Sequence, residues 1–360
     1  MPPLPLGFFL SNDNTGENIG TYFLHAIVSK MPFSPLAIVI DGSFALLNAV
    51  LSVSNYTLEE FLDETSVMEE KKIFSLKTFP LFCNAHLIKA AINFLRRQCP
   101  KTPHRTKKIL IAAFARFLDS KSTLEATEIF KLMCRVFHAN NCDVYAERTL
   151  FEKISGRTLG HDTLYDWNCL KLPDIDDSQP MPMLDKSTVQ LTATPDSLYV
   201  KSPYGKLAKN IFEHNATYRD NEACTNDLAV PKFIEYIAKK KFPLLPIVCS
   251  GILLNFFNLS TNTQPSGATR ISNATVEGYF SKVKNIIIKG KSATSEVIHH
   301  LREDMLSATA TWDTLILLPN ANKPKPYKKS SISTRKESFK KKSKPKNYHN
   351  PNFLQRLNRS

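Results

Sequence analysis

The stretch LAIVIDGSFALLNAV, residues 36–50, decides the fold. Its first five residues form a continuous apolar run rich in β-branched side chains, which is typical of a buried strand. The run ends on an acid, Asp41, and Ser43 then supplies the N-cap of an amphipathic helix. A strand that turns directly into a helix is the building unit of α/β domains, so we expect an α/β core here.

The sequence on the C-terminal side of this stretch continues the same alternation. Thr57 and Glu60 have the spacing of a capping box and predict the start of a second helix. The apolar run at 79–83 predicts another short strand, and residues 85–99 repeat apolar side chains at helical spacing. We therefore assign residues 1–100 to a partial α/β core.

The pattern then changes to helices alone. Residues 101–230 are mainly amphipathic helix, interrupted near 155–203 by a stretch rich in Asp, Pro, Ser and Thr that predicts a long loop. Residues 231–318 return to apolar stripes at helical spacing and are expected to complete the core. Residues 319–360 are rich in Lys, Ser and Pro, which predicts a disordered basic tail.

Net charge is concentrated in that tail. The chain has a formal charge of +14, but residues 319–360 hold 13 Lys and Arg against one acid, so residues 1–318 carry only +2. The folded body is therefore close to neutral as a whole. The tail suits nuclear import with auxiliary DNA contact, or alternatively a merely solubilising segment. Its basic cluster consists of Lys340, Lys341, Lys342, Lys344 and Lys346.

The cysteines and the hydropathy of the chain indicate the cellular environment in which the protein is expected to fold. Seven widely spaced cysteines do not form a disulfide framework and favour a reducing environment. The start of the chain lacks the basic region of a signal peptide. Residues 242–257 are the most apolar stretch, but they are short and contain two prolines, so we expect no membrane span.

Asp41 is the first candidate for chemistry. A carboxylate at the C-terminal end of a strand lies where α/β sheets form their functional edge, and carboxylate oxygens bind divalent metals. The alternative is an ordinary helix cap or turn residue before Gly42.

Cys83 and His86 form a Cys-x2-His step at the end of the second strand. A thiolate and an imidazole are zinc ligands, but zinc requires four. Cys134 and His138, or Cys249, are possible completions of such a site. The alternative is a buried structural cysteine beside a hydrogen-bonded histidine.

Glu277 is the third candidate, within the helical stretch SNATVEGYF at 272–280. It lies at the margin of the apolar stripe, so it is either a functional acid or a solvated helical glutamate. The lysines that follow it suit contact with a phosphate backbone, or an ordinary solvated face. They are Lys282, Lys284 and Lys289.

Taken together, the order of these features resembles the catalytic half of eukaryotic DDE transposases of the hAT, Mutator-like and related groups. A strand ends on Asp41, a Cys-x2-His step follows 42 residues later, and a helical insertion separates both from the Val-Glu-x-x-Phe-x-x-x-Lys helix. Residues 33–61, 79–94 and 231–302 carry the resemblance. It implies a ribonuclease H-like α/β core with a large all-helical insertion, with Asp41 and Glu277 as the second and third catalytic acids.

In that family three carboxylates hold two Mg²⁺ or Mn²⁺ ions that cut and join DNA by phosphoryl transfer. The resemblance implies that residues 4–41 match the third strand, first helix and fourth strand of the fold. The first two strands and the first catalytic Asp are then expected upstream of Met1, an N-terminally truncated core. Asp13 follows the wrong strand and lies in a polar loop, so it does not replace that acid.

The resemblance therefore implies a transposase-derived nuclear protein, ancestrally active on transposon ends and inactive or incomplete as this chain. Its expected partners are DNA and further copies of itself, with no small-molecule substrate. Mg²⁺ or Mn²⁺ would be the ancestral metal at Asp41 and Glu277, and Zn²⁺ is the candidate at Cys83 and His86. The alternative is a domesticated nuclear DNA-binding protein or protein-interaction scaffold without catalysis.

Overall fold

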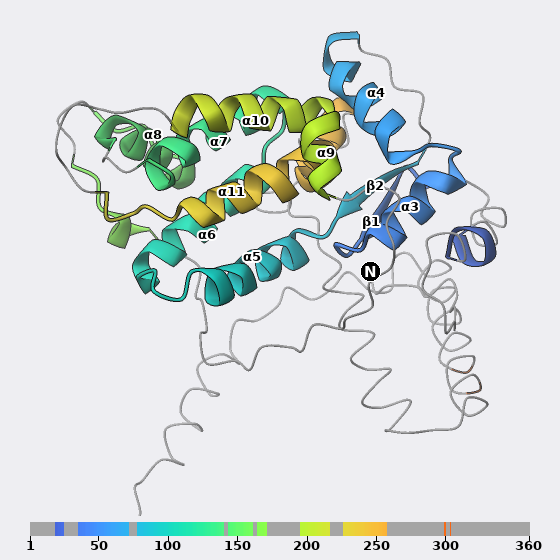
Figure 1. Cartoon of the computed structure of the whole chain (residues 1–360), viewed down its shortest axis with the longest axis horizontal. Helices are drawn as coiled ribbons and strands as arrows, with labels where there is room; N and C mark the ends of the chain where they lie inside the picture. Colours follow the sequence, from blue (N-terminus) through green and yellow to red (C-terminus); the bar gives the residue numbers. More distant parts are fainter. Residues whose placement is uncertain are drawn as a thin grey trace, which may run out of the picture. The chain divides into compact units, whose positions relative to one another are not determined.

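A computed structural model provides the fold of the chain (Figure 1). The chain divides into two units, Met1–Leu301 and Arg302–Ser360, and every described residue except Glu303 belongs to the first. The structure describes residues 19–24, 35–71, 78–139, 143–160, 164–170, 195–216 and 226–257, together with His299 and Glu303.

The described residues contain two short strands, β1 (Ala37–Ile40) and β2 (Phe79–Phe82), which pair in parallel. The register aligns the first residue of one strand with the first residue of the other. Figure 1 shows the pair side by side with α3 (Phe44–Val53) next to them. The prediction of a strand in each stretch is confirmed, although each is only four residues long.

Two helices make the crossover that parallel pairing requires, α3 and α4 (Leu58–Lys71). Ser43 caps α3 by accepting a hydrogen bond at its Oγ from the N–H of Leu46. The capping box before α4 forms as predicted. The N–H of Thr57 donates to Glu60 Oε2 at 2.8 Å, and the N–H of Glu60 donates to Thr57 Oγ1 at 3.2 Å.

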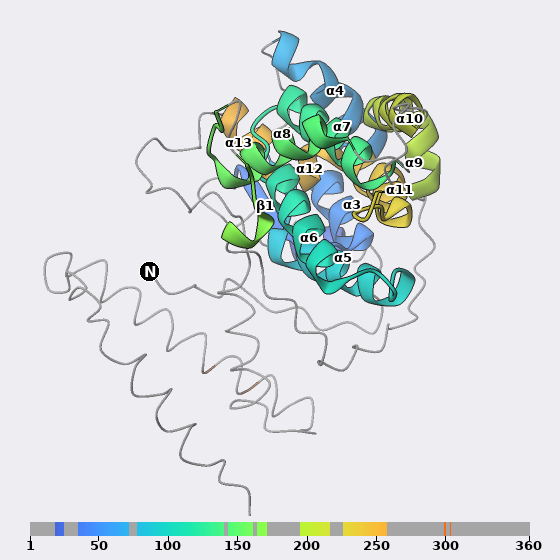
Figure 2. The same ribbon diagram turned by 90° about the vertical axis from the view of Figure 1, so that its left-hand side faces the viewer.

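Helices form the rest of the described structure. Figure 2 shows α6 between α5 on one side and α7 and α8 on the other, and the same helices contact one another along their lengths. No helix among the described residues is both long and apolar enough to cross a membrane. The further elements are the π-helix η1 (Ile19–Leu24), α5 (Asn84–Gln98), α6 (His104–Leu118), α7 (Thr123–Phe137), α8 (Val144–Ser155), η2 (Trp167–Cys169), α9 (Pro195–Lys201), α10 (Pro203–Ala216), α11 (Pro231–Lys240), η3 (Phe242–Leu244), α12 (Leu245–Val248) and α13 (Ser250–Phe256).

Aromatic side chains join the helices into one core. Phe117 of α6, Phe130 of α7 and Phe242 of η3 lie with ring centroids 4.8 to 6.3 Å apart, and all three are fully buried. Phe233 of α11 contacts Phe114 of α6 edge to face at 6.1 Å. Such ring pairs add to the stabilisation from burial itself, so the region expected to be an insertion shares its core with the C-terminal helices.

Two glycines allow backbones to approach closely. A Cβ at Gly251, in α13, would lie 2.6 Å from the carbonyl oxygen of Ser120 at the end of α6. A Cβ at Gly205, near the start of α10, would collide with the carbonyls of Leu198 and Tyr199 in α9. Because these neighbours are backbone atoms, any larger residue would force the helices apart.

The segment expected to be a loop is partly structured. Within 155–203 the structure places η2 and α9. Trp167 of η2 is buried, and its Nε1 donates to Glu147 Oε1 at 2.7 Å. The loop prediction does not hold for these two pieces, because one buried aromatic fixes η2 without any periodicity that a sequence pattern could show.

Asp143 has two structural tasks at the start of α8. Its Oδ1 accepts from the N–H of Ala146 at 2.9 Å, and its Oδ2 accepts from Arg135 Nε of α7 at 2.6 Å. The residue is 6% exposed. A single carboxylate therefore caps one helix and ties it to the preceding one.

Replacing that carboxylate should weaken the fold measurably. We expect Asp143→Ala to lower the free energy of unfolding by about 2–4 kcal/mol, because it removes a cap and leaves the Arg135 guanidinium without its partner. Urea denaturation measures the change. Glu128→Ala, which breaks the exposed 3.6 Å pair with Lys153, is the control and should cost less than about 1 kcal/mol. Equal effects of the two substitutions would contradict this assignment.

Lys241 lies at the end of α11 with its ammonium 5.4 Å from the centre of the Tyr236 ring. Burial lowers the pKa of Lys241 to about 8. The amine binds its proton less tightly in the folded chain than in the unfolded chain. At neutral pH, where the amine is protonated in both states, this difference lowers the free energy of unfolding.

We expect Lys241→Met to raise the free energy of unfolding at pH 7 by about 1 kcal/mol, since burial of the charge outweighs its attraction to the ring. The gain should shrink as the pH rises from about 8 toward 10.5, because the folded chain then holds a neutral amine without penalty. Urea denaturation at pH 7 and pH 10 measures both values. Lys131→Met on the exposed side of α7 is the control. A gain that is equal at both pH values would contradict the assignment.

Candidate functional site

The ends of the two strands bring the first candidates together. The N–H of Cys83 donates to the carbonyl oxygen of Ile40 at 2.8 Å, which continues the parallel pairing one step past the strands. Asp41 and Cys83 are thus the first residues beyond two neighbouring strands and share one edge of the sheet. We call Asp41, Cys83, Asn84 and His86 the carboxyl edge.

Asp41 is exposed at this edge. Of the alternatives to a functional acid, the helix cap is wrong, because the Ser43 side chain makes that cap, whereas the turn before Gly42 is present. Only the backbone of Asp41 is used locally, where its carbonyl accepts from the N–H of Ser43 at 2.7 Å. Its carboxylate makes no hydrogen bond or ion pair with any described residue, and the side chain is exposed.

Cys83 and His86 lie at the start of α5. Cys83 is fully buried at the N-cap position but makes no side-chain cap, and His86 is half-buried in the first turn. Each of the two residues takes part in a further interaction within the protein. This arrangement agrees with a structural role for the pair.

Within the described residues, the proposed completions of a zinc site do not form a metal-binding group with Cys83 and His86. Cys134 is buried within α7, and the Cys249 Sγ donates to the carbonyl of Phe117 at 3.1 Å. Burial raises the pKa of both thiols, which disfavours the thiolate that zinc binds. Within the described ranges, no group of three or more His, Cys, Asp and Glu side chains could hold a metal ion.

Asn84, the first residue of α5, is the residue that sequence reasoning missed. It is 3% exposed, and both its amide nitrogen and its amide oxygen are buried without a hydrogen-bond partner in the structure. A buried amide without partners costs about 1–3 kcal/mol. A polar residue between the Cys and His of the motif was the only available signal. Among the described residues, the carboxyl edge therefore combines an amide without a hydrogen-bond partner and a carboxylate without an ion pair.

The remaining sequence candidates lie outside the described residues. These are Glu277, the lysines at 282, 284 and 289, and the basic cluster of the tail. The pairing of Asp41 with Glu277 therefore stays a prediction.

Comparisons of the chain with protein-family profiles, with curated proteins and with solved structures found no match. The functional argument consequently rests on the residues of the carboxyl edge and on the pattern in which they occur.

The buried amide of Asn84 yields a stability test. We expect Asn84→Leu to raise the free energy of unfolding by about 1–2 kcal/mol, because an apolar side chain of the same branched shape replaces an unsatisfied polar group. Thermal and urea unfolding measure the change. Asn93→Leu, at a half-buried position of the same helix, is the control and should change stability by less than about 0.5 kcal/mol. A loss of stability in Asn84→Leu would show that the amide has a partner.

Proposed function

We propose that this chain derives from a DDE-type DNA transposase with a ribonuclease H-like core, and that the carboxyl edge is the remnant of its phosphoryl-transfer site. The parallel pairing of β1 with β2 is the observation that carries the proposal. It places an unpaired carboxylate and a Cys-x2-His step at neighbouring strand ends, in the order that the resemblance requires.

The donor set at this edge suits a hard divalent cation. Asp41 offers carboxylate oxygens that are exposed and unpaired among the described residues, and Mg²⁺ and Mn²⁺ prefer oxygen ligands. Asp41 and Glu277 would hold the ion. When bound, such an ion polarises the phosphoryl group and activates the attacking oxygen.

The chain's own residues give the edge its rigidity. The Ile40–Cys83 hydrogen bond fixes the spacing of the strand ends, and the buried Cys83 fixes the start of α5. The resembled family has three catalytic acids. Asp41 and Glu277 match the second and the third, and no residue of this chain matches the first. We therefore propose that the chain binds metal and DNA in the nucleus, as an oligomer, without cutting DNA.

Metal binding tests this proposal directly. In a titration of the full chain with Mn²⁺, followed by electron paramagnetic resonance, we expect Asp41→Asn and Glu277→Gln each to weaken binding about tenfold or more, because each removes a charged oxygen ligand. Asp63→Asn and Glu70→Gln are the matched controls, since both acids are exposed on α4 and neither belongs to the carboxyl edge.

Two outcomes would overturn the proposal. Equal Mn²⁺ binding by the unsubstituted chain, Asp41→Asn and Glu277→Gln would favour a scaffold without metal chemistry. Nicking of supercoiled plasmid by the unsubstituted chain, lost in Asp41→Asn, would show that the chain holds a complete catalytic site.

A further inference from the structure

The near-neutral charge of the folded body hides a strongly basic segment. Residues 71–118 contain 11 Lys and Arg and not one Asp or Glu. This acid-free segment forms β2, α5 and α6 with the turns between them. Arg105 pairs with Asp166 and Arg116 with Glu125, so the positive potential of these elements depends on the other cations of the segment.

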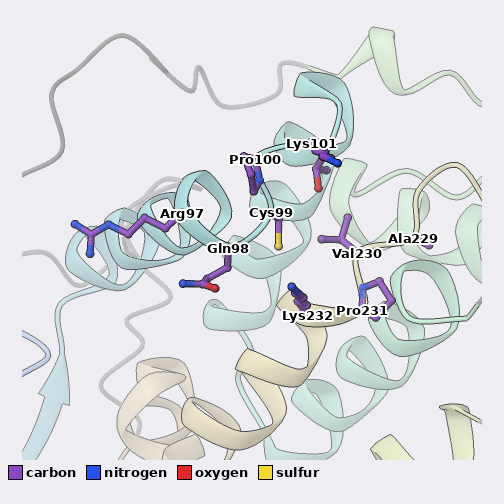
Figure 3. A pocket seen from close by; sticks show the side chains of 10 residues that line it. Arg97, Gln98, Cys99, Pro100, Lys101, Ala229, Val230, Pro231 and Lys232 are labelled. Carbon is purple, nitrogen blue, oxygen red and sulfur yellow. The ribbon is translucent and has the colours of Figure 1, made fainter.

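A pocket opens where this segment meets the start of α11 (Figure 3). Its volume is about 730 Å³. It is formed by the end of α5, the turn that follows it, and the chain leading into α11. The residues that line it are Arg97, Gln98, Cys99, Pro100, Lys101, Thr102, Ala229, Val230, Pro231 and Lys232. The lining thus includes three cations and no acid.

The side chains around the pocket leave positive charge unneutralised. Lys101 and Lys232 are exposed, whereas Lys107 is only 7% exposed. None of the three forms an ion pair or a side-chain hydrogen bond within the described part of the chain. Lys101 and Lys232 line the pocket, so an anion bound there would be attracted to both ammonium groups.

Cys99 shows that the charges of Lys232 and Lys107 act at the pocket. Its thiol lines the pocket, and the structure shows it directed inward (Figure 3). Burial raises the pKa of the Cys99 thiol, while the charges of Lys232 and Lys107 act on it in the opposite direction. Both ammonium groups are therefore close enough to stabilise negative charge at this position.

Two helices also begin beside the pocket. The N-cap positions of α6 and α11 are Pro103 and Val230, and neither makes a side-chain cap. Neither helix has an acid in its first turn. The carboxylate of Asp166 lies 3.8 Å from Arg105 in the first turn of α6, so we use only the start of α11, where a helix dipole favours a bound phosphate.

The C-terminal end of α5 also lies at the pocket, and its helix dipole is negative there. Two arginines in the last turn of α5 offset this negative charge. Arg96 and Arg97 occupy the last turn of α5, where cations stabilise the negative end of the helix dipole. Figure 3 shows the Arg97 side chain extending away from Cys99. We therefore assign the anion to the lysines and not to Arg97.

We propose that this pocket binds a backbone phosphate of a nucleic-acid strand, held by Lys101, Lys232 and the start of α11. Pro100, Val230 and Pro231 provide an apolar wall for the attached sugar. A strand is favoured over a free phosphate compound because the acid-free segment continues the positive charge beyond the pocket. The assignment does not depend on metal at the carboxyl edge, which lies at the other end of α5.

Nucleic-acid binding in the presence of EDTA tests the pocket separately from metal chemistry. The probe is a fluorescent single-stranded oligodeoxynucleotide, and the readout is anisotropy of the full chain over a range of salt concentrations. We expect Lys101→Gln/Lys232→Gln to weaken binding about tenfold and to reduce the slope of log affinity against log salt by about 1.4. The control Lys131→Gln/Lys206→Gln removes the same charge from exposed positions of α7 and α10. It should change the affinity and the salt slope much less.

Three further results decide the interpretation. If both double variants weaken oligonucleotide binding equally, the assignment of a phosphate to the pocket is wrong and the binding is general charge attraction. Unchanged binding in Lys101→Gln/Lys232→Gln, with an unchanged thermal midpoint, would overturn it as well. If inorganic phosphate or a mononucleotide stabilises the chain and displaces the oligonucleotide at equal phosphate concentration, the pocket accepts a small phosphate compound and the strand assignment fails.

Discussion

The parallel pairing of β1 with β2 is the constraint on which the described structure depends. Two four-residue strands cannot stand alone, because a parallel pair needs a crossover connection and cover on its faces. The crossover supplies α3 and α4, and β2 is fully buried against α3 and α12. Phe79 also stacks on Phe257 at 5.2 Å, so residues almost 180 positions apart in the chain meet at this strand.

The first strand and the helices around it could be predicted from the local sequence. The strand before Asp41, the cap at Ser43 and the capping box at Thr57 are all decided by neighbours within a few residues. The same holds for α6 and α7, whose apolar stripes repeat over four turns. Local patterns of this length leave few alternatives.

Other features could not be read from the sequence, because they depend on contacts between distant residues. Trp167 fixes η2 through Glu147, and Gly205 is needed only because α9 lies against it. The lack of partners at Asn84 is likewise a property of the folded surroundings. Of the candidate site, the sequence predicted that Asp41 follows one strand and that Cys83 ends another apolar run, whereas their shared edge and the unsatisfied amide beside them required the structure.

The charge distribution shows why net charge is a poor guide to partners. The tail holds most of the formal charge, yet the acid-free segment concentrates positive charge on two adjacent helices of a nearly neutral body. The reason is that acids elsewhere, such as the run in α4, balance the total without lying beside the lysines of the pocket. An anion is attracted by the local electrostatic potential of a folded surface. The charge of the acid-free segment is therefore a better guide to an anion site than the net charge of the chain.

Helix α5 connects the two functional proposals. Its first residues belong to the carboxyl edge and its last residues line the pocket. At 1.5 Å per residue its 15 residues span roughly 22 Å. A duplex that reached both ends would extend over about six base pairs at 3.4 Å per step. Because a packed helix has a fixed length, the two proposals together would place a phosphate in the pocket and the carboxyl edge several nucleotides apart along one bound nucleic acid.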